Sequence, residues 1–322
     1  MKKSNKILVA KGGFLASTFR EKGFKKCVAK IWAAIKMSVP LFLFGRRTNK
    51  SVGAYFDLIT DDGRLFYGDS FHFGYFPGEE ETLAQGLDAH TNLVANMACV
   101  QEGKQVLDIG CGICDPAKLI VKKYKCHITG VNISSEQVEQ GRALIAKEGL
   151  TNYIDVQEGN ALSLDFKSGS FDSILCLEVA GDICVSQEQK EILVKELYRV
   201  LKPGGHIGFS DLVFTSLPSK EDEQAMRTIL YHEGKELITD WSAYFLKQGF
   251  VIKNQKDIIK ETMKTWKHSL AVYEDNTAIV EKRYGKRVAQ STMDHLRKIP
   301  IILEKHASFP VLSLYKRPAT RD

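Results

Sequence analysis

The 322-residue chain lacks any run of eighteen uncharged apolar residues, so the sequence predicts no membrane-spanning helix. Its longest apolar patch, residues 31–45, is interrupted by Lys36 and Pro40. No internal repeat or low-complexity tract is visible. The remaining composition, 44% hydrophobic and 26% charged, is ordinary for a globular protein, and the length allows a full core.

The sequence also lacks the spacing of a metal site. Cys111 and Cys114 form one Cys-x-x-Cys, but no second pair exists, and the eight histidines are scattered without ligand spacing. The seven cysteines are odd in number and lie mostly in apolar, strand-like contexts. We therefore expect reduced, buried thiols, no bound metal and a cytoplasmic location.

Acidic residues are almost absent from the first fifty positions, which hold 13 Lys and Arg residues against the single acid Glu21. The remainder is mildly acidic, which argues against a nucleic-acid groove across the body. On a helical projection of residues 22–39, an apolar stripe with Trp32 opposes a lysine face. This pattern predicts peripheral membrane contact through residues 20–45, with docking on the body or organelle targeting as alternatives.

Strand-like and helix-like patterns alternate from residue 104 to about 211, which predicts a parallel α/β sheet. We expect Asp115 and Ser134 to cap the first two helices and residues 202–205 to turn the chain into the fifth strand. The predicted strands are residues 105–110, 126–133, 153–159, 171–178, 206–214 and 309–317, and the predicted helices are residues 116–124, 135–150 and 187–201, with a helix–strand pair at 239–258.

Two regions fall outside this alternation. Residues 51–100 are aromatic-rich and are expected to form a helical cap that precedes the first strand. Helical insertions at about 216–238 and 257–308 are expected to form a lid over the carboxyl edge of the sheet. The sequence thus divides into a basic arm (1–50), the cap (51–100) and a core with its lid (101–322).

The stretch VLDIGCGICD at residues 106–115 follows the first predicted strand, at the edge where open parallel sheets bind ligands. Gly110 and Gly112 permit close backbone approach. A dinucleotide loop needs G-x-G-x-x-G and a helix N-terminus free to receive a diphosphate, but this helix is entered through the anion Asp115. The loop instead suits a cofactor whose ammonium and sulfonium groups lie near Asp108 and Asp115.

Five signals follow one another in order: VLDIGCGICD, GVNISSEQV, EGNAL, FDSILCLE and RVLKPGG. The array resembles class I S-adenosylmethionine-dependent methyltransferases over residues of about 50–255. VNISSEQ and the aromatic motif YGDSFHFGYF at 67–76 resemble the branch that contains sterol, tocopherol and cyclopropane-fatty-acid methyltransferases. The resemblance implies a Rossmann-like, seven-stranded, mostly parallel sheet with helices on both faces and a helical lid, and S-adenosylmethionine as the cofactor.

The resemblance also implies the cofactor contacts. Asn132 and Gln137 fit a variant of the ribose-binding signature in which an uncharged residue replaces the usual acid, and Asn160 lies where the family contacts the adenine edge. The expected cofactor-binding residues are Tyr67, Asp108, Gly110, Cys111, Gly112, Asn132, Ile133, Gln137, Asn160, Ala161 and Leu177.

For catalysis, the resemblance points first to Glu178, which matches an acid that faces the reacting centre. His72 and Tyr75 are expected toward the amino-acid end of the cofactor, with plain packing as the alternative for each. Cys114 replaces the third motif glycine, and the histidine common shortly after Glu178 is absent. Asp211 stands where cyclopropane synthases tend to have histidine, which makes cyclopropane formation less expected than methyl transfer.

The expected function is therefore methyl transfer to a small, lipophilic acceptor such as an isoprenoid, sterol or quinone, by in-line displacement in a dry aromatic pocket. Glu178 or His72 would take a proton from a hydroxyl or ammonium acceptor, whereas Glu178 and aromatic faces would stabilise a carbocation from an alkene. Methylation of a polar metabolite at nitrogen or oxygen, and a cofactor-binding scaffold without catalysis, are the alternatives.

Overall fold

The computed structural model describes residues 70–223 and 239–318, together with residues 52, 53, 56, 57, 60 and 64. These residues belong to one compact unit, Thr48–Asp322. The basic arm, the predicted membrane contact at 20–45 and Tyr67 lie outside the described residues, as does the part of the predicted lid at 224–238.

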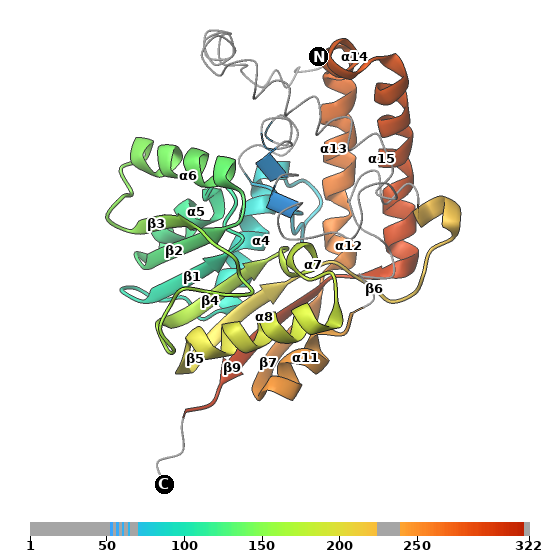
Figure 1. Ribbon diagram of the computed structural model, residues 1–322. Helices are drawn as coiled ribbons and strands as arrows, with labels where there is room; N and C mark the ends of the chain where they lie inside the picture. The colour runs from blue at the N-terminus through green and yellow to red at the C-terminus, as the bar shows by residue number, and fades with distance from the viewer. Residues whose placement is uncertain are drawn as a thin grey trace. The chain divides into compact units, whose positions relative to one another are not determined.

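Seven strands form one sheet in the order β3-β2-β1-β4-β5-β9-β7 (Figure 1). Strands β1 to β5 run parallel, and β9 runs antiparallel to both of its neighbours. This confirms the predicted mostly parallel, Rossmann-like fold. The sheet consists of β1 (Gln105–Ile109), β2 (His127–Asn132), β3 (Ile154–Glu158), β4 (Phe171–Leu177), β5 (Leu201–Ser210), β7 (Phe250–Asp257) and β9 (Pro310–Lys316), and β6 (Val213–Phe214) pairs separately with β8 (Ala307–Ser308).

The central strands are nearly continuous apolar runs because helices cover both faces of the sheet. Leu107 in β1 and Ile174 in β4 are fully buried. One face carries α4 (Leu83–Met97), α5 (Asp115–Tyr124) and α6 (Ser135–Lys147), and the other carries α8 (Gln187–Val200) and α11 (Trp241–Gln248) (Figure 1).

A glycine sets the distance between α4 and the sheet. A Cβ atom at Gly208 of β5 would come within 2.0 Å of the carbonyl oxygen of Val94 in α4. Ser313 of β9 donates a hydrogen bond to the carbonyl of Met97 at the end of the same helix, over 2.7 Å. Helix α4 therefore lies directly against β5 and β9, with His90 in the middle of its buried face.

Four helices join β7 to β9: α12 (Ile259–Thr262), α13 (Lys264–Asp275), α14 (Thr277–Tyr284) and α15 (Lys286–His306). Buried Trp266 of α13 and Leu303 of α15 belong to the same apolar core as α4. None of the described helices combines the length and the apolar character that crossing a membrane requires.

Several local predictions differ from the structure. Ser134 caps α6 as expected, but the N-cap of α5 is Cys114, in a left-handed conformation, and Asp115 is the first residue of the helix. Residues 202–205 belong to β5 instead of forming a separate turn before it. The aromatic residues 70–76 are not helical, because their amide groups bond to other elements.

Candidate active site

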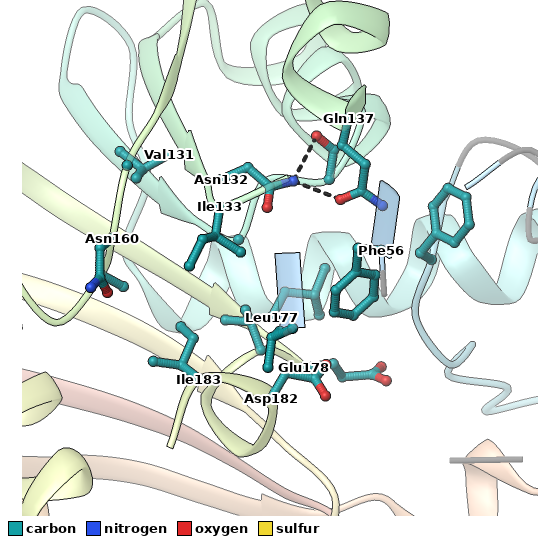
Figure 2. A pocket seen from close by; sticks show the side chains of 17 residues that line it. Phe56, Val131, Asn132, Ile133, Gln137, Asn160, Leu177, Glu178, Asp182 and Ile183 are labelled. Atoms are coloured by element: carbon teal, nitrogen blue, oxygen red, sulfur yellow. Dashed lines mark hydrogen bonds between the residues drawn. The ribbon is translucent and has the colours of Figure 1, made fainter. Parts of the chain in front are cut away.

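A cavity lies along the carboxyl ends of β1, β2, β3 and β4 and encloses about 760 Å³ of space, part of it open to solvent. Figure 2 shows its side chains converging from these strand ends and from the segment before β1. The lining residues are Val52, Phe56, Phe71, Gly110, Gly112, Val131, Asn132, Ile133, Gln137, Gly159, Asn160, Ala161, Leu177, Glu178, Val179, Asp182 and Ile183.

The loop after β1 forms one wall of the cavity with its backbone, because Gly110 and Gly112 have no side chain. Gly110 and Gly112 both have positive φ, and a Cβ atom at Gly110 would lie 2.2 Å from a methyl carbon of Val179. The amide of Gly110 donates to the carbonyl of Val131 over 2.8 Å, which fixes the loop on β2. The side chain of Cys111 is buried behind the loop and does not line the cavity.

An amide pair at the end of β2 forms a second wall. The Nδ2 group of Asn132 donates to Oε1 of Gln137 at 2.7 Å and to the carbonyl of Gly112 at 3.2 Å (Figure 2). Asn132 is buried and has to donate in both contacts. An ionised aspartate has no N–H or O–H donor, so these two acceptors explain why the residue is uncharged here.

Residues from the segment before the sheet complete this side of the cavity. The hydroxyl of Ser134 donates to Oδ1 of Asp57 at 2.6 Å, and the amide of Glu136 donates to the same oxygen at 3.2 Å. This acid at the start of α6 interacts favourably with the helix dipole. Phe56, next to it in the sequence, presents its ring to the cavity (Figure 2).

Glu178 follows β4 with a φ of +53°, a left-handed conformation that is uncommon for a residue with a side chain. Its Oε1 accepts a 2.8 Å hydrogen bond from the amide of Phe73. Burial raises the pKa of Glu178 well above its ordinary value, the Phe73 amide lowers that pKa, and the nearby charge of Asp182 raises it. Figure 2 shows Glu178 and Asp182 together at one end of the cavity.

Two more buried acids lie close to this edge of the sheet. Burial raises the pKa of Asp108 to about 7, and its Oδ2 atom has no hydrogen-bond partner within the described part of the chain. Burial raises the pKa of Asp211 well above its ordinary value, although its carboxyl group accepts from the amides of Gly181 and Leu212. Buried carboxyl groups with shifted pKa values are typical of functional sites.

The structure places the predicted site residues in three groups. Gly110, Gly112, Asn132, Ile133, Gln137, Asn160, Ala161, Leu177 and Glu178 line the cavity. His72, Tyr75, Asp108 and Cys111 do not line it, and Tyr67 lies outside the described residues.

Two of the expected catalytic residues face other parts of the protein. The hydroxyl of Tyr75 accepts a hydrogen bond from Lys256 of β7, and that ammonium group lies 4.4 Å from the centre of the tyrosine ring. Nδ1 of His72 faces the carbonyl of Phe73 at 2.8 Å, and its Nε2 faces the hydroxyl of Thr91 at 3.2 Å. The geometry therefore does not support direct contact of either side chain with a ligand in the cavity.

The carboxylate of Asp115, which was expected near the charged groups of the cofactor, has other partners in the structure. Its carboxylate accepts from the hydroxyl of Ser70 at 2.6 Å and pairs with Lys118 at 2.6 Å, and it does not line the cavity. Sequence reasoning had no signal for Phe56 or His90, which lie outside the motifs. Asp182 lines the cavity as well, but it was not among the predicted site residues.

Residues 106–205 match a family model described as a methyltransferase domain. The chain contains a methyltransferase domain. The match starts in β1, includes the glycine loop and Glu178, and ends in β5, so it covers the strands whose carboxyl ends form the cavity. The class I methyltransferase resemblance predicted from the sequence is confirmed.

The curated proteins that this chain resembles include sterol 24-C-methyltransferases. The chain is 34% identical over 161 residues to ERG6A of Gibberella zeae, covering 50% of this chain and 41% of that protein. It is 29% identical over 213 residues to erg6 of Aspergillus fumigatus, covering 63% of this chain and 54% of that protein. The chain thus spans about half the length of these relatives, and the predicted resemblance to this branch is confirmed.

Solved structures show the same fold. The cyclopropane synthase MmaA2 from Mycobacterium tuberculosis superposes with a TM-score of 0.74 at 16% identity, covering 84% of this chain and 99% of that one. The [4+2]-cyclase SpnF superposes with a TM-score of 0.71 at 22% identity, covering 84% and 97%. At these identities the likeness concerns the fold alone.

We predict that Asn132→Asp destabilises the methyltransferase by about 1–3 kcal/mol at neutral pH, because an ionised carboxylate would face the Gly112 carbonyl without a donor. The free energy of unfolding, measured in urea, should show a cost that grows with pH as the introduced carboxyl group ionises. Asn160→Asp is the matched control, since Asn160 uses its oxygen to accept from the amide of Leu162. Equal losses in both variants would contradict the argument.

Proposed function

We propose that the cavity binds S-adenosylmethionine and that the protein transfers its methyl group to a lipophilic acceptor, with the alkene of a sterol side chain as the candidate. The observation that carries the proposal is the buried, raised-pKa carboxyl of Glu178 at the end of an otherwise largely apolar cavity. The sterol 24-C-methyltransferase relatives support the acceptor class.

The residues at the cavity fit this cofactor. Asp108 does not line the cavity itself, but it is buried just before the glycine loop that does, and its unpartnered Oδ2 suits an ammonium group that reaches past this loop. Asn132 and Gln137 offer amide groups for the ribose hydroxyls, and the wall at Asn160 and Ala161 suits the flat adenine. When bound, the cofactor supplies an electrophilic methyl group on a positively charged sulfur.

An alkene acceptor gives Glu178 a defined role. As the carbon–carbon bond forms and the sulfur–methyl bond breaks, the positive charge passes to a carbon of the acceptor. Glu178 and Asp182 place negative charge at this end of the cavity, which stabilises such a cation. The raised pKa of Glu178 makes its ionised carboxylate a better base for the proton that then leaves the acceptor.

Apolar side chains around the cavity limit the access of water to this chemistry. Phe56, Phe71 and Ile183 give the cavity apolar walls. We further propose that residues 51–100 act as the cap and that helices α12 to α15 belong to a lid. The hydrogen bond from the amide of Gly74 to Oγ1 of Thr265, 2.9 Å long and buried, joins these two regions and supports the proposal.

The test of function is methyl transfer from radiolabelled S-adenosylmethionine to desmosterol, a sterol with a double bond at carbon 24. Cholesterol, which lacks that double bond, is the matched control. We predict label in desmosterol alone, and a loss of about 100-fold or more in the rate with Glu178→Gln while calorimetry shows retained cofactor binding.

Other outcomes separate the alternatives. Labelling of phosphoethanolamine in place of desmosterol would favour methylation of a polar metabolite. Cofactor binding without labelling of either compound would favour a scaffold that does not catalyse. Absence of cofactor binding at high micromolar concentration would refute the proposal as a whole.

The Asp108 pKa of about 7 predicts a pH dependence for cofactor binding. Below pH 7 the carboxyl holds a proton that an incoming ammonium group has to displace, so affinity should fall toward tenfold per pH unit. Above about pH 8 the cofactor amine itself deprotonates, and affinity should fall again. Calorimetry between pH 5.5 and 8.5 measures both falls in affinity, the acidic limb of the profile below pH 7 and its basic limb above about pH 8.

In Asp108→Asn the acidic limb should disappear and binding should be weaker at pH 7.5. Asp115→Asn is the matched control, because the Asp115 carboxylate already pairs with Lys118 and should leave the acidic limb in place. An unchanged acidic limb in Asp108→Asn would show that another group titrates.

We also propose peripheral membrane contact through residues 20–45, on the amphipathic pattern of the sequence alone. The full chain should float with vesicles that contain phosphatidylserine, and a chain without residues 1–50 should remain in the dense fraction. A full-length Trp32→Asp variant, which interrupts the apolar stripe, should also lose flotation. Equal flotation of all three chains would contradict the proposal.

A further inference from the structure

The backbone of Phe73 is held by three side chains that come from different parts of the fold. Its carbonyl oxygen lies 2.8 Å from Nδ1 of His72 and 2.7 Å from Nδ1 of His90 in α4. Its amide donates to Oε1 of Glu178 at the end of β4. Both imidazoles are buried, and their rings meet edge to face with centroids 5.5 Å apart.

This geometry fixes the tautomer of both histidines. A carbonyl oxygen only accepts, so each Nδ1 has to carry the proton. Burial lowers the pKa of His72 to about 3 and of His90 to about 4, so both rings are neutral at pH 7. Nε2 of His72 then accepts from the hydroxyl of Thr91, while Nε2 of His90 is buried and has no partner within the described part of the chain.

The two histidines differ in one contact. Nδ1 of His90 also lies 3.2 Å from Oε1 of Glu178, beside its 2.7 Å contact with the Phe73 carbonyl. The same Oε1 accepts from the Phe73 amide. The Phe73 amide and the His90 ring therefore both lie against Oε1 of Glu178, and neither contact involves Oε2.

A metal centre is the competing interpretation, because ligand-type atoms of His72, His90 and Glu178 lie within 4.8 Å of one another. The hydrogen bonds argue against it. Both nitrogens of His72 are engaged, and the Nδ1 of His90 points its proton at oxygen atoms. The cluster is a hydrogen-bonded clamp on the Phe73 backbone.

We propose that His90 is a positioning residue that holds Oε1 of Glu178 in place, so that Oε2 faces the acceptor. The inference rests on the proposed function, in which Glu178 acts on the acceptor. His90 itself does not line the cavity and reaches the chemistry only through Glu178. His72 shares the burial and the carbonyl contact but lacks the contact with Glu178, which makes it the matched control.

The experiment compares His90→Leu, His90→Asn and His72→Leu by kcat, KM and the pH profile of desmosterol methylation. Removal of the His90 N–H donor disfavours the Glu178 carboxylate, so the acidic limb of kcat should move to higher pH. The same loss should lower kcat by about 10- to 100-fold with little change in KM. The His90→Asn variant offers an amide N–H in place of Nδ1–H. It should restore part of the lost kcat and move the acidic limb part of the way back.

Other titratable groups near Glu178 also influence its pKa. They are His90 from α4, the charge of Asp182 from α7 (Ala180–Ile183) and Asp211 after β5, with His72 nearby. All of them except the substituted histidine are unchanged in each variant. In His72→Leu the acidic limb of kcat should therefore stay in place, whatever loss of kcat the weakened clamp on Phe73 causes.

A double-mutant cycle separates positioning from folding. In a Glu178→Gln background, His90→Leu should cause no further loss of kcat, because the group that it positions is already gone. An equal loss of kcat in both backgrounds, or equal effects of His90→Leu and His72→Leu with an unmoved acidic limb, would overturn the proposal. Thermal melts of each variant with bound S-adenosylmethionine identify any that fail to fold.

A second readout does not depend on the acceptor. In protein labelled with ¹³C at glutamate carboxyl carbons, the Glu178 signal is assigned as the one that Glu178→Gln removes. Its titration should move to higher pH in His90→Leu and remain in place in His72→Leu. If desmosterol is not methylated but this shift is seen, the acceptor is wrong and the positioning contact stands; an unshifted titration overturns the contact itself.

Discussion

The hydrogen bond from the Phe73 amide to Glu178 joins two parts of the chain that lie 105 residues apart, and the arrangement of the site depends on it. On one side it fixes the aromatic segment, whose next amide, at Gly74, bonds to Thr265 of α13. On the other side it holds the carboxyl group that follows β4. Two adjacent amides thus tie the segment before the sheet to the end of β4 and to helix α13.

The fold was predictable because its signals are local. Apolar strands alternate with capped helices along the chain. Each strand that was expected to run parallel does so. The parallel direction is enough to place the loop at Gly110, the Asn132–Gln137 pair and Glu178 at one edge of the sheet. The prediction that the site residues after β2, β3 and β4 lie together followed from this topology, without knowledge of any distance. The antiparallel direction of β9 had no comparable signal in the strand itself.

The structure differs most from the expected site where contacts between separate elements decide what a side chain faces. Asp115 was expected to present its charge to a ligand, but Ser70 and Lys118 already satisfy it. Tyr75 was expected in the pocket, but its hydroxyl accepts a hydrogen bond from Lys256 of β7. His90 carries no motif at all. Its position opposite Glu178 exists only once α4 packs on the sheet, so no pattern along the chain could reveal it.

Three buried acids, Asp108, Glu178 and Asp211, work against stability at the edge where the cavity forms. Each has a raised pKa, so the carboxyl group in the unfolded chain loses its proton at a lower pH than the same group in the folded protein. Their contribution favours the folded state at low pH and is lost as pH rises toward the folded pKa values. A stable scaffold would replace them with apolar residues, whereas a site for cationic ligands and transition states needs the charges desolvated in advance. The cost of burying them is therefore physical support for a site that handles positive charge.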